Sequence, residues 1–190
     1  MKKKIEVRQL SKERIPDYLD YFDNRAFADN PDWGFCYCTF LYADTSVKSW
    51  GQYTTQENRE AVIQLIGDDQ LRGYLAYVNG KAIGWCNAAP RVLIPALKRL
   101  PGDKIDQIGS IACFVIAKEF RYQEIASQLL AAACAGFQEQ GLKIAEAYPR
   151  PHSKSESSNH YGPLKMYLTA GFEAYRKDPG RRMIVRKELA

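Results

Sequence analysis

The sequence predicts an α+β fold: one domain of residues 1–190 with a mixed, mostly antiparallel central sheet flanked by helices. Its 190 residues, 46% of them hydrophobic, suit a single domain with a sizeable core. Strand-like segments occur in pairs around turn signals, at Asn79-Gly80 and at Asp178-Pro179-Gly180. Segments with helical spacing lie before and between these pairs, and we therefore expect both element types in one domain.

The N-terminal third begins with a strand in KIEVRQL, where Ile5 and Val7 alternate with charged residues. Ser11 offers an N-cap for a helix that runs to about Phe27, with Pro16 near its start. In DNPDWGFCYCTFLYAD, the first six residues indicate a turn, and the apolar remainder fits a strand or a helix. TTQENREAVIQLI predicts a capped helix from Thr55 to about Gly67.

The middle of the chain contains the strongest local signal. LRGYLAYVNGKAIGWCNAAP predicts a hairpin turning at Asn79-Gly80. Pro90, Pro95 and Pro101-Gly102 then indicate a connecting loop. IDQIGSIACFVIA is apolar on both faces, as an interior strand would be.

The C-terminal part continues with a helix after FRYQ that ends near Gly141. Its apolar residues recur at helical spacing: Ile125, Leu129, Leu130, Ala133 and Phe137. KIAEAYP predicts a strand, RPHSKSESSNHYG a polar loop and PLKMYLTA a short helix. GFEAYRK and RRMIVRK predict two final strands joined by the Asp178-Pro179-Gly180 turn.

Composition narrows the class of partner. The net charge is +5, but Lys and Arg are scattered apart from KKK at positions 2–4, so we expect no nucleic-acid partner. An anionic small molecule fits the mild positive excess equally well. No apolar run approaches the ~20 residues of a membrane span, and the N-terminus lacks a signal-peptide core. We therefore expect no membrane partner and a soluble, cytoplasmic protein. The five cysteines fit buried free thiols better than disulfides.

The stretch FRYQEIASQLL predicts a tight turn between a strand and a helix. The first backbone N–H groups of a helix have no partner within it, and the helix dipole adds positive potential there. Such a turn can hold a pyrophosphate. The alternative is an ordinary helix start that holds only a cap.

Several side chains are candidates for chemistry. Glu146 shares a strand face with Ile144 and Tyr148; it could act as a base, hold an ammonium group or form an ion pair with an Arg. Arg91 could meet an acidic substrate or lie in solvent. Cys36 and Cys38 could chelate, but the only two histidines, His152 and His160, lie in one loop, and no metal site is expected. Cys113 fits a packing role better than a nucleophile, because no base for it is evident.

The order of these elements resembles the GNAT superfamily of N-acetyltransferases. The residues that carry the resemblance are GYLAYVNGKAIGW, CFVIAKEFRYQEIASQLL and MYLTAGFEAYRK. WGFCYC and GWCNAAPR are similar to a bacterial subgroup of that family with an N-terminal W-x-x-C-Y-C motif. The resemblance implies acetyl-coenzyme A (acetyl-CoA) as the donor.

The resemblance also implies a set of cofactor-binding residues. The family's diphosphate loop has Arg or Gln, two residues, Gly, one residue, then Gly or Ala; this chain matches at Arg121 and Ala126 and has Glu124 in place of the first glycine. The backbone of Phe114, Val115 and Ile116 is expected along the pantetheine arm. N–H groups of the loop should face the diphosphate, and Asn159 should touch the cofactor; the loop residues are Arg121, Tyr122, Gln123, Glu124, Ile125, Ala126 and Ser127.

The resemblance implies an activity as well. Tyr167, four residues before Gly171-Phe172, matches a tyrosine that protonates the leaving thiolate in relatives; a core tyrosine using its hydroxyl as a cap is the alternative. The predicted function is direct acetyl transfer to the amine of a small molecule or peptide, in a monomer or a homodimer. Glu124 adds bulk and a charge like that of the phosphates, which Lys118 or Arg121 could screen. The alternative function is therefore a catalytically altered acyl-CoA binding or regulatory module.

Overall fold

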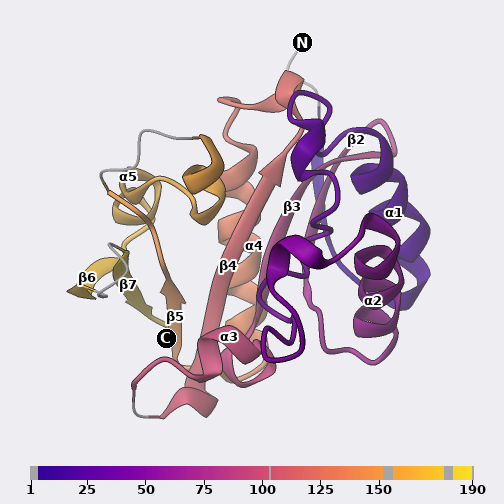
Figure 1. Cartoon of the computed structure of the whole chain (residues 1–190). Helices are drawn as coiled ribbons and strands as arrows, with labels where there is room; N and C mark the ends of the chain where they lie inside the picture. The colour runs from indigo at the N-terminus through magenta and orange to yellow at the C-terminus, as the bar shows by residue number, and fades with distance from the viewer. Residues whose placement is uncertain (1–3, 103, 152–155, 178–181, 190) are drawn as a thin grey trace.

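The computed structural model describes residues 4–102, 104–151, 156–177 and 182–189. These residues form one sheet of seven strands in the order β1-β2-β3-β4-β5-β7-β6 (Figure 1). Every neighbouring pair is antiparallel except β4 and β5, which are parallel. The strands are β1 Ile5–Gln9, β2 Gly73–Val78, β3 Lys81–Pro90, β4 Ile108–Ile116, β5 Ile144–Ala147, β6 Glu173–Lys177 and β7 Met183–Glu188.

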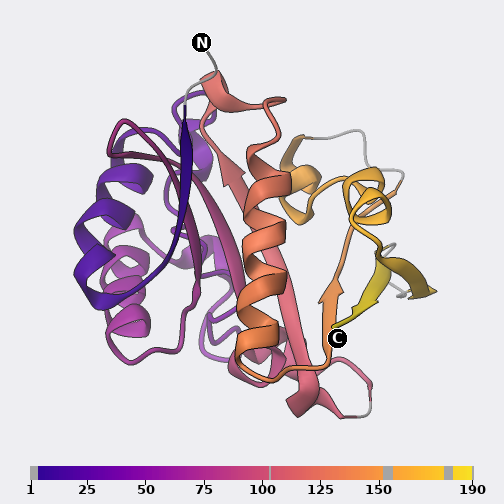
Figure 2. The ribbon, with the colours of Figure 1, turned by 180° about the vertical axis from the view of Figure 1, so that it is seen from behind.

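Helices cover both faces of this sheet. The α-helices are α1 Ile15–Asn24, α2 Thr55–Gly67, α3 Pro95–Lys98, α4 Ile125–Glu139 and α5 Leu164–Thr169. α4 crosses one face, which Figure 2 shows from its own side. α1 and α2 lie on the other face. Separate apolar clusters fill the two interfaces, one around Leu129 and Phe137 and one around Tyr18 and Trp85. The predicted α+β class and mixed, mostly antiparallel sheet are confirmed.

Most predicted elements are present, with shifted ends. The hairpin turns at Asn79 and Gly80, whose φ angles of 50° and 76° suit a type I′ turn. α2 has the predicted N-terminus, where Thr54 and Glu57 form a capping box. The first helix is shorter than predicted. A 3₁₀ turn at Lys12–Arg14 precedes it, and the α-helix itself runs only from Ile15 to Asn24. The Ser11 side chain caps no N–H group. The Asp178-Pro179-Gly180 turn lies outside the described residues.

Three predictions need correction. The apolar stretch that follows DNPDWG is neither strand nor helix, because Tyr37 and Cys38 adopt left-handed φ angles of 42° and 56° that interrupt both. The connecting loop after β3 contains the short helix α3. The polar loop before α5 contains a 3₁₀ helix, η7, at Glu156–Tyr161.

The two halves of the sheet separate beyond a short junction. Only residues Ile108–Ile111 of β4 pair with β5, where their partners are Ile144–Ala147. In the described part of the chain, no strand pairs with the rest of β4 on that side, while β3 pairs with its other side up to Ile116. Figure 1 shows the divergence of β4 and β5. The diverging edge of β4 leads directly to the N-terminus of α4.

Candidate active site

The free edge of β4 presents the backbone of Phe114 and Ile116. Ala117 donates its N–H to the Ile83 carbonyl on β3 at 3.0 Å. Backbone groups of successive strand residues point to opposite edges, so those of Phe114 and Ile116 point away from β3. Val115 lies between them with its backbone toward β3, and its carbonyl accepts a 2.8 Å hydrogen bond from the Tyr21 hydroxyl.

The turn after β4 ends in an uncapped helix. Glu124 is the N-cap residue of α4, yet its side chain accepts no N–H group there. Among the described residues, no protein acceptor receives the backbone N–H groups from Tyr122 to Ser127. Because α4 has 15 residues, its dipole reinforces these free donors. The predicted phosphate-binding turn therefore has the donors that such a site needs.

Two non-glycine residues of this turn have left-handed backbones. The φ angle is 62° at Tyr122 and 63° at Glu124. A side chain in this region costs about 1–2 kcal/mol, which glycine avoids. The conformation therefore explains why glycine is favoured where this chain has Glu124. The Glu124 side chain is exposed and Tyr122 is fully exposed, so neither fills the turn.

Arg121 holds the turn in place. Its Nη1 and Nη2 contact both carboxylate oxygens of Asp29 at 2.7 and 2.9 Å, and its Nε donates to the Ile116 carbonyl at 3.0 Å. Hydrogen bonds from Arg121 lower the pKa of Asp29 below its ordinary value. The Arg121 guanidinium thus joins the turn to the segment after α1. It forms its ion pair with Asp29 rather than with Glu124.

The remaining loop residues differ in exposure. Gln123 is exposed and its Nε2 donates to the Glu119 carbonyl at 2.7 Å. Ile125 is buried under the turn, Ala126 is half-buried and Ser127 is exposed. Asn159, in η7, is exposed, and its carbonyl accepts the Gly162 N–H at 2.8 Å.

Tyr167 is completely buried on α5. Its hydroxyl donates to the Tyr161 carbonyl at 2.6 Å. Burial raises the pKa of Tyr167 well above its ordinary value, so the phenol keeps its proton. The hydroxyl thus closes the end of η7, as the capping alternative describes. η7 itself contacts β4, and Tyr161 packs in one apolar cluster with Ala112.

Glu146 lies in a buried ionic network. Its Oε1 is 3.2 Å from Arg91 Nη1 and accepts the Tyr148 hydroxyl at 2.7 Å, while its Oε2 accepts Arg186 Nε at 2.7 Å. The Tyr148 hydroxyl also contacts Ser110 Oγ at 2.7 Å. Burial, with the adjacent Glu146 charge, raises the pKa of Tyr148 well above its ordinary value. The structure therefore has the ion-pair alternative for Glu146.

Arg91 occupies neither predicted environment. It is fully buried, and its guanidinium donates to the carbonyl groups of Leu97, Leu100 and Pro101 as well as to Glu146. Sequence reasoning missed Arg91 and Arg186 as partners of Glu146, and Ser110 as a partner of Tyr148, because these residues are distant in the chain. The one available signal was the shared strand face of Glu146 and Tyr148.

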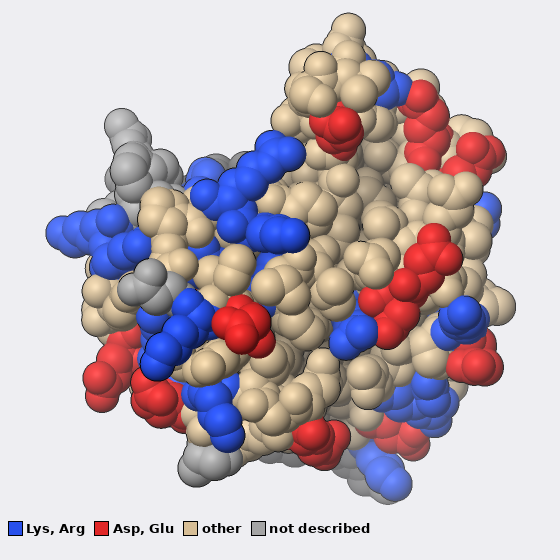
Figure 3. Space-filling model, turned by 90° about the horizontal axis from the view of Figure 1, so that it is seen from below, with Lys and Arg blue, Asp and Glu red and all other residues tan. Residues whose placement is uncertain are grey.

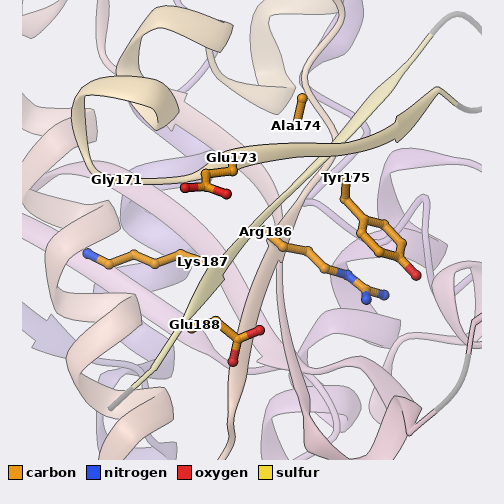
Figure 4. A pocket seen from close by; sticks show the side chains of 7 residues that line it. All are labelled: Gly171, Glu173, Ala174, Tyr175, Arg186, Lys187 and Glu188. Atoms are coloured by element: carbon orange, nitrogen blue, oxygen red, sulfur yellow. The ribbon is translucent and has the colours of Figure 1, made fainter.

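A shallow pocket of 390 Å³ lies beside this network, on the β6–β7 hairpin. Figure 4 shows Tyr175 and Arg186 together at one side of it; the Arg186 Cζ is 3.6 Å from the Tyr175 ring centroid. In Figure 3, Lys and Arg gather on the left of the lower face, the side on which Figure 1 places β6 and β7. The pocket contains none of the predicted site residues.

Two kinds of feature are absent from the described residues. No group of three His, Cys, Asp or Glu side chains is placed to hold a metal ion. His152 lies outside the described residues. None of the described helices combines the length and the apolarity needed to span a bilayer.

The residues that form the parted β4 and β5 strands and the uncapped α4 turn lie within a match to an acyltransferase family. Residues 15–158 match the family model described as "Acetyltransferase (GNAT) family", so this chain belongs to the GNAT acetyltransferase family. No curated protein matches the chain.

Solved structures share the fold at low sequence identity. PaiA N-acetyltransferase from Thermoplasma acidophilum, in complex with coenzyme A, is 16% identical with a TM-score of 0.56, covering 97% of this chain and 99% of that one. The GNAT domain of S. lividans PAT is 15% identical with a TM-score of 0.62, covering 97% and 90%. Aminoglycoside N-acetyltransferase AAC(6')-Iy, in complex with coenzyme A, is 16% identical with a TM-score of 0.56, covering 94% and 93%.

Proposed function

We propose that this protein is an N-acetyltransferase that moves acetyl from acetyl-CoA to the amine of a small molecule or peptide by direct attack. The observation that carries the proposal is the uncapped N-terminus of α4 beside the free edge of β4. Family membership and the coenzyme A complexes of two structural neighbours support it.

The residues present fit the donor. The N–H groups from Tyr122 to Ser127 have no protein acceptor among the described residues and would hold the diphosphate. The backbone of Phe114 and Ile116 would hydrogen-bond the pantetheine arm, and Val115, between them on β4, would support that edge through its pairing with β3. Asn159 completes the proposed set. When bound, acetyl-CoA supplies a thioester whose carbonyl carbon an amine can attack.

The proposed reaction makes one bond and breaks one. The neutral amine forms the C–N bond, the C–S bond breaks, and the thiolate takes a proton from Tyr167. The attacking nitrogen loses one proton to become the amide, and that proton restores the Tyr167 phenol. The raised pKa keeps that proton on the phenol until it is needed. The hydroxyl must turn from the Tyr161 carbonyl to deliver it. Because both Glu146 oxygens are engaged, we assign Glu146 a positioning role, through Arg91 and Arg186, in place of a base.

The proposal extends to partners and location. The proposed partners are the acetyl donor and an amine acceptor. The proposal includes neither a nucleic-acid partner nor a membrane partner. A cytoplasmic location, a homodimeric state and membership of the W-x-x-C-Y-C subgroup are further parts of this proposal. The alternative, an acyl-CoA binding or regulatory module, is favoured by one observation, the Glu124 carboxylate at the turn.

Calorimetry and a Tyr167→Phe variant test the proposal together. We expect acetyl-CoA to bind the wild-type protein, and an amine panel assayed for thiol release to reveal turnover. Tyr167→Phe should lower turnover about 10²–10⁴-fold, the range of general acid catalysis, with little change in donor affinity. A melting curve checks the fold, since an orphaned Tyr161 carbonyl costs about 1–3 kcal/mol.

Each outcome separates the two functions. Absence of binding at millimolar acetyl-CoA would contradict both the acetyltransferase and the acyl-CoA binding module. Binding without turnover for any amine would favour the regulatory module. Unchanged turnover of a folded Tyr167→Phe variant would remove Tyr167 from the acid role while leaving the activity itself intact.

A further inference from the structure

Two cysteines from distant segments meet beneath the α1–α2 face of the sheet. Cys38 comes from WGFCYC and Cys113 from β4. The Cys38 Sγ accepts the Asn87 Nδ2 at 3.4 Å. Asn87 is the β3 residue in register with Cys113, so the β3–β4 pairing brings Cys113 beside the same amide. The Cys38 and Cys113 side chains therefore both lie beside the Asn87 side chain.

The backbone is constrained to present Cys38 there. Tyr37 and Cys38 are consecutive left-handed residues, at about 1–2 kcal/mol each. Buried contacts hold them: the Tyr18 hydroxyl donates to the Tyr37 carbonyl at 2.8 Å, and the Tyr37 hydroxyl donates to Asp23 at 2.5 Å. Unfavourable backbone that the surroundings enforce in this way is concentrated at functional positions.

A hydrogen-bond donor faces the Cys38 sulfur. It is the Asn87 amide, and Asn87 is fully buried. Trp85 is also fully buried, and its indole N–H has no hydrogen-bond partner among the described residues. A donor that faces a sulfur favours a thiolate over a thiol. The neighbouring Cys113 side chain, together with Trp85 and Asn87, lowers the pKa of Cys38 despite its burial. The same contact raises the pKa of Cys113.

We propose that Cys38 and Cys113 form an oxidisable dithiol that a hydroperoxide converts into a disulfide. The Cys38 thiolate attacks the O–O bond, giving a sulfenic acid and hydroxide (or alkoxide). The Cys113 thiol then condenses with the sulfenic acid, forming the S–S bond and releasing water. Two electrons pass from the two sulfurs to the peroxide, and the proposal does not depend on acetyl transfer.

Exposure differs among the cysteines in a way that suits this role. Cys113 is partly exposed, which gives a small peroxide a route, and Cys38 is 5% exposed behind it. Cys86 and Cys134 lie in the cluster beneath α4, on the opposite face, where burial raises the pKa of each thiol. The bond would tie the segment before α2 to the strand that carries the proposed donor-binding edge.

Peptide mass spectrometry of the full chain tests the proposal. The protein is treated with about one equivalent of hydrogen peroxide, denatured, alkylated and digested. We expect a Cys38–Cys113 linked peptide, with Cys134 alkylated. Burial raises the pKa of Cys134 to about 11, whereas the pKa of Cys38 is lowered from its ordinary value. Cys38 then has the larger thiolate fraction and should be oxidised faster than Cys134.

Two further measurements keep the test independent of one variant. One equivalent of phenylarsine oxide, which bridges close dithiols, should remove two thiols together, Cys38 and Cys113. Asn87→Leu removes the amide donor at similar volume and should slow oxidation of Cys38, while Cys134→Ser should leave the linked peptide unchanged. Equal oxidation of Cys38 and Cys134, or a link through Cys36, in the folded wild-type protein would overturn the proposal.

Discussion

At the scale of single residues, Glu124 combines two separable effects. Its backbone is left-handed at φ 63°, which glycine adopts without cost. Its exposed carboxylate lies at the N-cap of the helix whose free N–H groups form the proposed diphosphate site. The first effect acts on stability and the second on affinity, so two substitutions can distinguish them.

Glu124→Gly should increase both stability and acetyl-CoA affinity, whereas Glu124→Gln should increase only the affinity. Glycine relieves the strain of a side chain on a left-handed backbone, but it also gives the unfolded chain more conformational entropy. The net gain in unfolding free energy should be about 1 kcal/mol. Both variants remove a charge that repels one phosphate by about 1–3 kcal/mol at ~5 Å, and acetyl-CoA affinity should rise about tenfold. Calorimetry and urea unfolding measure the two quantities.

The comparison between these variants is the control. If Glu124→Gln gained no affinity, the carboxylate would point away from the donor and the charge argument would fail. If Glu124→Gly were no more stable than wild type, the left-handed backbone would carry no cost in this turn.

Residue-scale sequence reasoning succeeded where the signal was local. FRYQEIASQLL predicted the strand-to-helix turn and identified Glu124 as the unusual residue, because turn chemistry depends on neighbours in the chain. It failed for Arg91, which follows Pro90 in a loop-like stretch yet is fully buried. Its partner Glu146 is 55 positions away, and only the folded sheet brings the two charges together.

At the scale of elements, α4 packs on the sheet through close contacts at two glycines. A Cβ on Gly136 would lie 1.7 Å from the Tyr74 hydroxyl oxygen. A Cβ on Gly109 of β4 would lie 2.4 Å from the Phe137 ring. These glycines set how closely the helix approaches, and thereby where its N-terminus meets the end of β4.

Gly136→Ala should therefore destabilise the protein, against the usual effect of this substitution. Alanine in a helix interior is favoured over glycine by about 1 kcal/mol. Overpacking against Tyr74 should cost about 1–3 kcal/mol and more than offset that gain. Urea unfolding followed by circular dichroism measures the difference.

Gly67→Ala provides the matched helical control. Gly67 ends α2, and a Cβ there would meet no atom within 4 Å. This variant should be neutral or slightly stabilised. Equal, favourable changes in both variants would show that Tyr74 moves aside without cost.

Helices and strands, like single residues, could be predicted where the signal lies in neighbouring residues and not where it depends on distant contacts. α2, the hairpin and α4 were predictable because caps, the Asn79-Gly80 turn and apolar periodicity are written in consecutive residues. The 34–49 stretch was not, since its apolar residues pack against α1 and β3 while its backbone turns repeatedly. The Cys38–Cys113 contact could not be predicted either, because the β3–β4 register creates it.

At the scale of the whole molecule, one junction joins the two halves of the sheet. It consists of the short β4–β5 pairing and the buried network of Arg91, Glu146 and Arg186. Arg91 follows β3, Glu146 lies on β5 and Arg186 on β7, so a single carboxylate connects both halves. The separation of β4 and β5 beyond this junction creates the proposed donor site.

Glu146→Gln should loosen that junction. The amide keeps the shape of the side chain but leaves the buried Arg91 guanidinium and the partly buried Arg186 guanidinium without their counter-charge. Breaking a buried ion pair costs about 3–5 kcal/mol, and we expect a loss of this size in urea unfolding. Glu139→Gln, at an exposed carboxylate on α4, should change stability by less than about 0.5 kcal/mol.

The same pair of variants separates stability from chemistry. Under the positioning role, Glu146→Gln that remains folded at low temperature should weaken acetyl-CoA binding, because the two walls of the donor site are less firmly joined. A base would instead show normal affinity, normal stability and lost turnover. That pattern would return Glu146 to the reaction itself and would contradict the junction as the origin of its burial.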